Sequence, residues 1–317
     1  MPSRPHWPPR AGALAAVLFA IALAGCGAGD DGNRAAAPTG QAREAPGGEL
    51  TGVMLDMQLN EVSGLTASHL HDDVLWLHDD GDNPPRLFAV DTRGSRLATF
   101  GVEGVTKTDW EDIAGFELDG TRYLLIADVG DNGGLRRTLL LHAIEEPAHL
   151  HDGGTLEPAW SIAFRWPDGP RDCEAVAVDA ANQQVLLVSK KRRPPELFAV
   201  PLRPAKADVQ TARPLGRLAG IAGRGAVDDT ARLLAQVSAT DLSPDGRTLA
   251  VLTYGGLRLY RRSGTEGWAE AAARYPLRRD VPWLHQPEAV AWSVDGLGLY
   301  ATGEFSPAPL VYLPLEP

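Results

Sequence analysis

The sequence predicts an all-β protein, a β-propeller with five blades. An acidic residue that leads into a short apolar strand occurs five times, at Glu61, Glu111, Glu174, Asp241 and Glu288. Further strand-like runs and turn signals follow each occurrence. The spacing between successive acidic residues runs from 47 (241 to 288) to 67 (174 to 241), which is close to the length of a four-stranded blade. Helical periodicity is nearly absent, and only 267–273 looks helical.

Each unit starts with its acidic strand and continues outward. Val/Leu/Phe-rich runs bounded by Gly, Pro and Asp define the strands. The first two units are expected to hold strands at 61–66, 74–78, 86–90 and 96–100, then at 111–116, 123–127, 137–142 and 160–164. The third and fourth units are expected at 174–178, 184–189, 196–200 and 213–218, then at 239–242, 248–253, 257–261 and 270–275.

The fifth unit contains three expected strands, 288–292, 298–302 and 310–313. The segment 50–59 has no unit of its own. We expect it to form the outer strand of the fifth unit, which closes the ring and hides a free edge. Six blades remain an alternative, in which the long spacings around 143–170 or 219–236 contain a further unit.

The N-terminus is typical of an export signal. A basic start precedes the apolar run 11–22, which is short for a membrane span. The sequence Leu23-Ala24-Gly25-Cys26 resembles the bacterial lipobox, in which the cysteine is lipidated after cleavage. We therefore expect a signal peptide at 1–25, a flexible tether at 26–49 and one propeller domain at 50–317. The alternative is an ordinary secretory signal with a chance cysteine.

This organisation predicts an exported protein that is attached to the bacterial cell envelope only through the lipid on Cys26. The formal net charge of −11 argues against nucleic acid and anionic membranes as partners. Once Cys26 is assigned to the signal, Cys173 is alone and no intramolecular disulfide can form. The sequence leaves the oligomeric state open.

One face of the predicted propeller collects acidic residues. In a meander, the starts of the first strands and the loops between the second and third strands lie on the same face. Flexible loops rich in carboxylates suit Ca²⁺, so we expect a calcium site there. Its candidate ligands are Glu61, Asp80, Glu111, Asp112, Asp128, Glu174, Asp241 and Glu288.

A basic loop interrupts this acidic face. Lys190 and Lys191 occupy the position at which the first two units have carboxylates, and Tyr254 occupies it in the fourth. We expect these three residues to bind a small anionic ligand beside the metal. The alternatives are structural: the strand-start acids accept peptide N–H groups of the neighbouring blade, the Asp-Asn loops are turn formers, and 190–193 is a solvated charged run.

Several motifs carry a resemblance to a family of bacterial secreted propeller lipoproteins. They are Ser63-Gly64-Leu65, Asp109-Trp110-Glu111-Asp112-Ile113-Ala114, Ala127-Asp128-Val129-Gly130-Asp131-Asn132, Arg171-Asp172-Cys173-Glu174-Ala175 and Gln286-Pro287-Glu288-Ala289. More distantly the chain is similar to β-propeller phytases, to esterase-like phytases and to the SdiA-regulated five-bladed proteins. The phytase resemblance implies Ca²⁺ in the channel and phosphate on a lysine, which map to Glu61, Glu111, Asp128, Glu174, Asp241 and Lys190.

Two functions are consistent with these features. The first is metal-dependent hydrolysis of a phosphoester or ester. The second is a non-catalytic module that binds an envelope ligand or protein partner. The motifs of serine hydrolases, zinc proteases and P-loop enzymes are absent from the sequence, and no catalytic residue is assigned.

Overall fold

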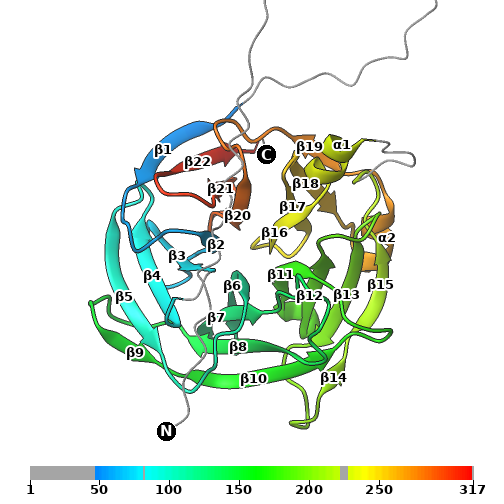
Figure 1. The fold of residues 1–317 in the computed structure, drawn as a ribbon, viewed down its shortest axis with the longest axis horizontal. Helices are drawn as coiled ribbons and strands as arrows, with labels where there is room; N and C mark the ends of the chain where they lie inside the picture. Colours follow the sequence, from blue (N-terminus) through cyan, green and yellow to red (C-terminus); the bar gives the residue numbers. More distant parts are fainter. Residues whose placement is uncertain (1–46, 81–82, 222–227, 316–317) are drawn as a thin grey trace, which may run out of the picture. The chain divides into compact units, whose positions relative to one another are not determined.

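The computed structural model describes residues 47–80, 83–221 and 228–315, and within them five β-sheets form a ring (Figure 1). This confirms the predicted five-bladed propeller. The innermost strands of the five blades surround the centre of the ring. The predicted signal peptide, Cys26 and most of the tether lie outside the described residues. Among the described residues, neither helix is long and apolar enough to cross a membrane.

The first three blades run outward in chain order. The first contains β2 (Val62–Ala67), β3 (Val74–Asp79), β4 (Arg86–Asp91) and β5 (Arg96–Val102). The second contains β6 (Trp110–Leu118), β7 (Thr121–Asp128), β8 (Leu139–Glu145) and β10 (Pro158–Arg165). The third contains β11 (Cys173–Asp179), β12 (Gln184–Ser189), β13 (Glu196–Pro201) and β15 (Arg213–Arg217), with the short 3₁₀ helix η1 (Ala180–Asn182) between β11 and β12.

The fourth blade consists of β16 (Val237–Leu242), β17 (Thr248–Thr253), β18 (Gly256–Arg261) and β19 (Leu277–Arg279), and the helix α1 (Asp229–Leu234) precedes it. The prediction of a strand at 270–275 was wrong, because this segment is largely the helix α2 (Trp268–Ala273). Trp268, Ala271 and Ala272 have the spacing of one helix face, and all three are buried in the apolar core between blades three and four. The apparent helical periodicity at 267–273 is thereby confirmed.

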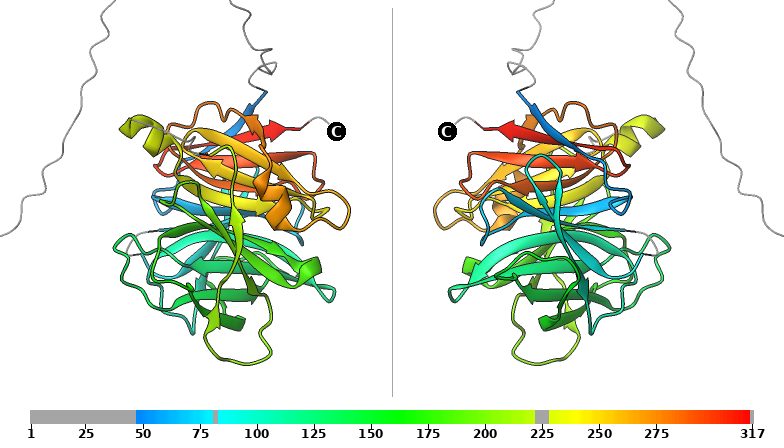
Figure 2. Two further views of the ribbon diagram at one scale, coloured as in Figure 1. Left: turned by 90° about the vertical axis from the view of Figure 1, so that its right-hand side faces the viewer. Right: turned by 90° about the vertical axis from the view of Figure 1, so that its left-hand side faces the viewer.

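The fifth blade consists of β20 (Pro287–Trp292), β21 (Gly298–Gly303), β22 (Ala308–Pro314) and β1 (Glu49–Met54). β1 pairs antiparallel with β22 from Glu49 opposite Tyr312 to Met54 opposite Ala308. The side views show β1, in blue, beside β22, in red (Figure 2). The predicted closure of the ring by the N-terminal segment is therefore confirmed.

The long spacings do not contain a sixth blade within the described residues. β9 (Gly154–Leu156) pairs in parallel with β5, and β14 (Gln210–Thr211) pairs in parallel with β10. Both short strands thus extend the outer edge of the blade that precedes their own in the ring. The covered edges leave fewer unpaired peptide groups in the first two blades.

A β-bulge marks the start of every inner strand. In β2 the register passes from Val62 opposite Asp79 to Gly64 opposite His78, which leaves Ser63 as an extra residue. The same shift recurs in β6, β11, β16 and β20. The extra residues of the five blades are Ser63, Glu111, Glu174, Ser238 and Glu288.

The bulges correct the repeat register deduced from the sequence. Glu61 and Asp241 are not equivalent to the other three acids, because serines occupy the bulge in blades one and four. A bulge places an extra side chain on one face of the strand. It can therefore direct one polar group from each blade toward the start of the central channel.

Side chains of the inner strands bind the peptide groups of the next inner strand. The Asp241 carboxylate accepts the Trp292 N–H at 2.7 Å, and the Thr66 hydroxyl accepts the Gly115 N–H at 2.8 Å at the equivalent position. The Asp112 carboxylate accepts the Val176 N–H at 2.9 Å. The apolar interfaces between blades surround these contacts. Trp76, Trp110 and Trp292 are buried in these interfaces.

Removal of β1 tests the closure of the ring. A chain that begins at residue 47 keeps every contact of β1, so we expect its thermal unfolding to match that of the longer chain. A chain that begins at residue 55 loses the pairing with β22 and the fully buried Met54. Burial of one such side chain contributes about 2 kcal/mol, and the exposed β22 edge adds to the loss. Equal melting temperatures for the two chains would contradict this role of β1.

Candidate functional site

A polar cavity of about 240 Å³ opens where the inner strands begin. All five blades contribute to it, through the starts of the inner strands and through the loops between the second and third strands. This confirms that both loop sets share one face. We call this cavity the mouth; it is lined by Glu61, Val62, Ser63, Asp80, Glu111, Asn132, Glu174, Lys190, Tyr254, Gln286, Glu288 and Glu304.

The mouth contains five of the eight predicted metal ligands, namely Glu61, Asp80, Glu111, Glu174 and Glu288. Glu61 has a φ of 69°, in the left-handed region that few residues with a side chain adopt. Glu304, Asn132 and Ser63 were not among the predicted site residues. Their signal is positional: Glu304 and Asn132 come from second-to-third loops, and Ser63 is the bulge residue of blade one.

The other three predicted ligands lie outside the mouth and bind protein groups. Asp112 accepts three peptide N–H groups, and Asp241 accepts two. Asp128 accepts the N–H of Thr108 at 2.9 Å and pairs with Arg136 at 2.6 Å. The structural alternative proposed for the acids therefore describes Asp112 and Asp241, which link neighbouring blades.

Three buried carboxylates converge between blades two and three. One oxygen each from Glu111, Asp172 and Glu174 lie within 4.8 Å of one another. Glu111 and Glu174 are bulge residues of adjacent inner strands, and Asp172 directly precedes β11. Asp172 belongs to one of the motifs that carry the family resemblance, but it was not among the eight predicted ligands. A set of three oxygen donors at this separation suits a hard divalent cation.

Gly130 leaves room for two of the carboxylates in this part of the mouth. A Cβ atom on Gly130 would lie 2.1 Å from Oε1 of Glu111 and 2.3 Å from Oδ2 of Asp109. Any side chain at this position would therefore displace at least one of the two. Asp109 thus belongs to the same cluster, although its residue does not line the cavity itself.

Two lysines face the three carboxylates. The Lys190 ammonium forms an ion pair and hydrogen bond with Oε1 of Glu174, and its side chain is 12% exposed. Lys191 lies 2.8 Å from Oδ2 of Asp172 and also donates to Oδ1 of Asn132. The basic loop is therefore anchored on the acidic cluster rather than fully solvated.

Tyr254 connects this lysine to the opposite wall. Its hydroxyl donates to Oε1 of Glu288 at 2.7 Å, and its ring lies 5.8 Å from the Lys190 ammonium. The three residues predicted to bind an anion therefore lie in the mouth or at its rim. Their donors are already engaged with carboxylates, so an anionic ligand has to compete for them or arrive with a cation.

Burial and mutual repulsion shift the pKa values of these acids. Burial raises the pKa of Glu111 well above its usual value, and Glu174, Asp109 and Asp80 raise it further. The pKa of Glu174 is also raised by burial, although the Lys190 ammonium opposes the shift. Burial raises the pKa of Glu288 to about 7, and burial next to Asp80 raises that of Asp109 to about 6.

The pKa of Lys190 is raised as well, and for a lysine this shift favours the charged form. Burial alone would lower the pKa of Lys190, but Glu174, Glu288 and Glu111 outweigh burial and raise it. The ammonium thus stays charged and partly neutralises the mouth. Cys173 directly precedes Glu174 in the chain and is fully buried. Burial raises the pKa of its thiol, and this disfavours a thiolate nucleophile. The arrangement is suited to holding a cation, and none of the described residues of the mouth is an activated nucleophile.

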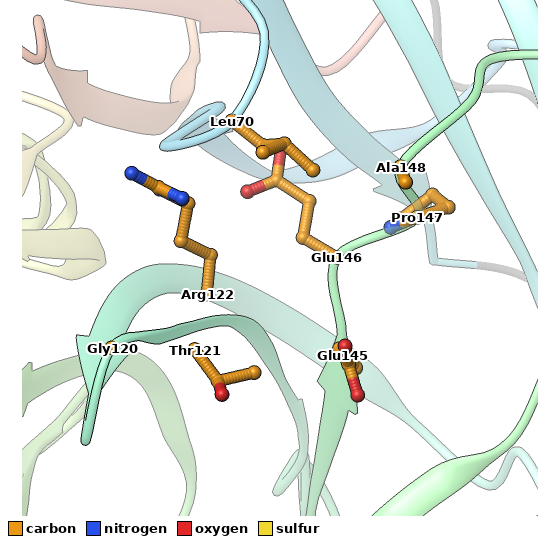
Figure 3. A pocket seen from close by; sticks show the side chains of 8 residues that line it. All are labelled: Leu70, Gly120, Thr121, Arg122, Glu145, Glu146, Pro147 and Ala148. Atoms are coloured by element: carbon orange, nitrogen blue, oxygen red, sulfur yellow. The ribbon is translucent and has the colours of Figure 1, made fainter.

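Figure 3 shows a different cavity, of about 410 Å³, formed by the β6–β7 turn, the end of β8 and Leu70. The side chains of Arg122 and Glu146 extend toward its interior. The Glu146 carboxylate accepts bonds from the Ser68 hydroxyl, the His69 N–H and the Trp76 indole N–H. Glu146 therefore holds the turn after β2 in place, and we assign no ligand to this cavity.

Comparisons with known proteins do not identify a family. No family model matches the chain, and no curated protein matches it. Among solved structures it is similar to Raptor from Chaetomium thermophilum, with 13% identity and a TM-score of 0.37 over 80% of this chain and 19% of that one. It thus spans about a fifth of that protein.

Two further solved structures are similar to the chain. Hydrazine synthase from Kuenenia stuttgartiensis has 13% identity and a TM-score of 0.39, over 75% of this chain and 68% of that one. A candidate 6-phosphogluconolactonase from Bacteroides uniformis has 12% identity and a TM-score of 0.38, over 80% and 67%. Similarity at this level does not transfer a function, and the resemblance to the secreted propeller and phytase families stays a prediction.

The raised pKa of Glu288 predicts how stability depends on pH. Above pH 7 its buried carboxylate is charged in the folded protein; between pH 7 and 4.5 the folded state takes up a proton that the unfolded state does not. Without divalent ions, stability should therefore increase as the pH falls through this window. The raised pKa of Glu288 contributes about 3 kcal/mol to this change in the free energy of unfolding. Urea unfolding at several pH values in the presence of a chelator measures it.

Glu288→Gln mimics the neutral acid and keeps an acceptor for the Tyr254 hydroxyl. The variant should be more stable than the wild type at pH 8 and should show a flatter pH profile. Glu117→Gln, at an exposed position, serves as the matched control and should retain the wild-type profile. A Glu288→Gln profile parallel to that of the wild type would show that Glu288 does not titrate in this window.

Proposed function

We propose that the protein is a propeller that binds a divalent cation, Ca²⁺, in its mouth and holds a small anionic ligand beside it. The observation that carries the proposal is the convergence of Glu111, Asp172 and Glu174 within 4.8 Å. Each is at most 6% exposed. Buried like charges raise each other's free energy, and a cation relieves this repulsion. Three carboxylates would supply part of the oxygen coordination that Ca²⁺ takes.

The position of Lys190 supports an anionic ligand. Its ammonium is bound to Glu174 and faces Tyr254 within the same cavity. When a cation occupies the carboxylates, the lysine loses part of its attraction to Glu174 and becomes available as an anion anchor. A phosphate or carboxylate group held between the metal and Lys190 agrees with the expectation from the phytase resemblance. Hydrolysis of a phosphoester or ester is the catalytic form of this proposal.

Calcium binding tests the proposal directly. We expect heat of binding in calorimetry and a higher melting temperature with Ca²⁺ than with chelator. Glu174→Gln, Glu111→Gln and Asp172→Asn should each weaken binding about tenfold or more, since loss of a charged ligand costs at least 1.4 kcal/mol. Glu117→Gln, outside the mouth, should bind like the wild type. Absence of both heat and stabilisation in the wild type would refute the metal site.

The variant Lys190→Met tests whether Lys190 competes with the cation for Glu174 and whether it holds the anionic ligand. Because the ammonium competes with the cation for Glu174, this variant should bind Ca²⁺ more tightly than the wild type. The same variant should lose any calcium-dependent binding of phosphate esters. If a panel of phosphoesters and lactones is hydrolysed in a calcium-dependent manner, Glu174→Gln should abolish the activity. A calcium-binding protein that is inactive on the whole panel would favour the non-catalytic binding module.

We further propose that the protein is attached to the cell envelope through a lipid on Cys26. The lipobox-like Leu23-Ala24-Gly25-Cys26 supports this proposal. Cys26→Ala should shift the protein from the membrane fraction to the soluble fraction of lysed cells. Cys173→Ala is the matched control, because Cys173 is buried in the propeller, and it should stay in the membrane fraction. Unchanged fractionation of Cys26→Ala would contradict lipid anchoring.

A further inference from the structure

A further cavity, of about 330 Å³, lies at the outer part of blade two. The antiparallel pairing of β8 and β10 places Phe164 opposite Leu139, so Arg165 follows beside Thr138. The loop before β8 adds two arginines, and the segment before β14 adds an apolar side. The lining residues are Arg136, Arg137, Thr138, Arg165, Trp166, Gly169, Pro170 and Val209. None of the mouth residues takes part.

The charge of this cavity is opposite to that of the chain. Its lining contains three arginines and no acidic residue, in a protein with a net charge of −11. The Arg136 guanidinium forms an ion pair with Asp128 and donates hydrogen bonds to backbone carbonyls. Arg137 is exposed and has no ion-pair partner among the described residues. Within the described part of the chain, the Arg165 guanidinium donates its Nε–H to the Thr211 hydroxyl at 3.2 Å, and most donors of these two guanidinium groups have no protein partner there.

Trp166 forms a fixed side of this cavity. Its side chain is 5% exposed. The ring packs against Phe164, Phe198 and the Arg171 guanidinium, at distances of 5.3 and 5.0 Å between ring centroids and 5.2 Å from the guanidinium carbon. The arginines of the cavity therefore lie beside a rigid aromatic wall.

We propose that this cavity binds a soluble phosphate group, as inorganic phosphate or as a small phosphate monoester. Guanidinium groups match the oxygens of phosphate in pairs, and two unpaired arginines balance the two negative charges of the group. Trp166, Pro170 and Val209 offer apolar surface for the organic part of an ester. The negative charge of the whole chain disfavours a phosphate on an anionic membrane.

Titration of the purified full-length protein with inorganic phosphate in calorimetry tests this site. We expect saturable binding of one phosphate in the presence of a chelator, because the site does not depend on a cation. Arg137→Gln and Arg165→Gln should each weaken it about tenfold, as expected when a charge-assisted hydrogen bond worth at least 1.4 kcal/mol is lost. Both side chains are exposed, so these variants should fold. Arg93→Gln, an exposed arginine of blade one, is the matched control and should bind like the wild type.

Three results would overturn the proposal: no saturable binding of phosphate by the wild type, wild-type affinity in both arginine variants, or loss of binding in Lys190→Met, which would place the phosphate in the mouth.

Discussion

The bulge at the start of each inner strand is the feature on which the rest of the site depends. It inserts one extra residue per blade where the five strands approach one another, and in four blades that residue lines the mouth. Three of these are glutamates and one is Ser63. The extra residue is turned toward the channel because it has no partner on the next strand. A regular ladder would direct alternate side chains into the apolar interfaces between blades.

The mouth brings like charges close together, which costs free energy. The surrounding fold holds these side chains in place. Carboxylates of adjacent strands lie close together, and their raised pKa values reflect burial and repulsion. The propeller holds them there because its interfaces are apolar and its ring is closed by β1. Asp112 and Asp241 add hydrogen bonds between blades below the mouth. Lys190 offsets part of the repulsion, and a bound cation would offset more.

The sequence predicted most strands and the shared face of the loops, but not the roles of individual acids. Glu61 and Asp241 looked equivalent to Glu111, Glu174 and Glu288, because each starts a similar apolar run. The register shows that Ser63 and Ser238 are the equivalent residues. A shift of two or three residues is invisible in short degenerate repeats, yet it decides whether a carboxylate faces a channel or a peptide N–H. Asp172 was not among the predicted ligands, and only the packing of blades two and three brings it to Glu111 and Glu174.

The sequence alone determined the all-β class, the five units, the closing N-terminal strand and the concentration of acids on one face. These follow from local patterns, namely strand periodicity, turn residues and the spacing of the units. Only the tertiary structure decided which acids meet and which are used internally. It also placed Lys190 on Glu174 and brought Arg137 and Arg165 to one cavity, with no ion-pair partner for either among the described residues. Such contacts join residues distant in the chain, so they depend on register and blade packing, which a single sequence encodes only indirectly.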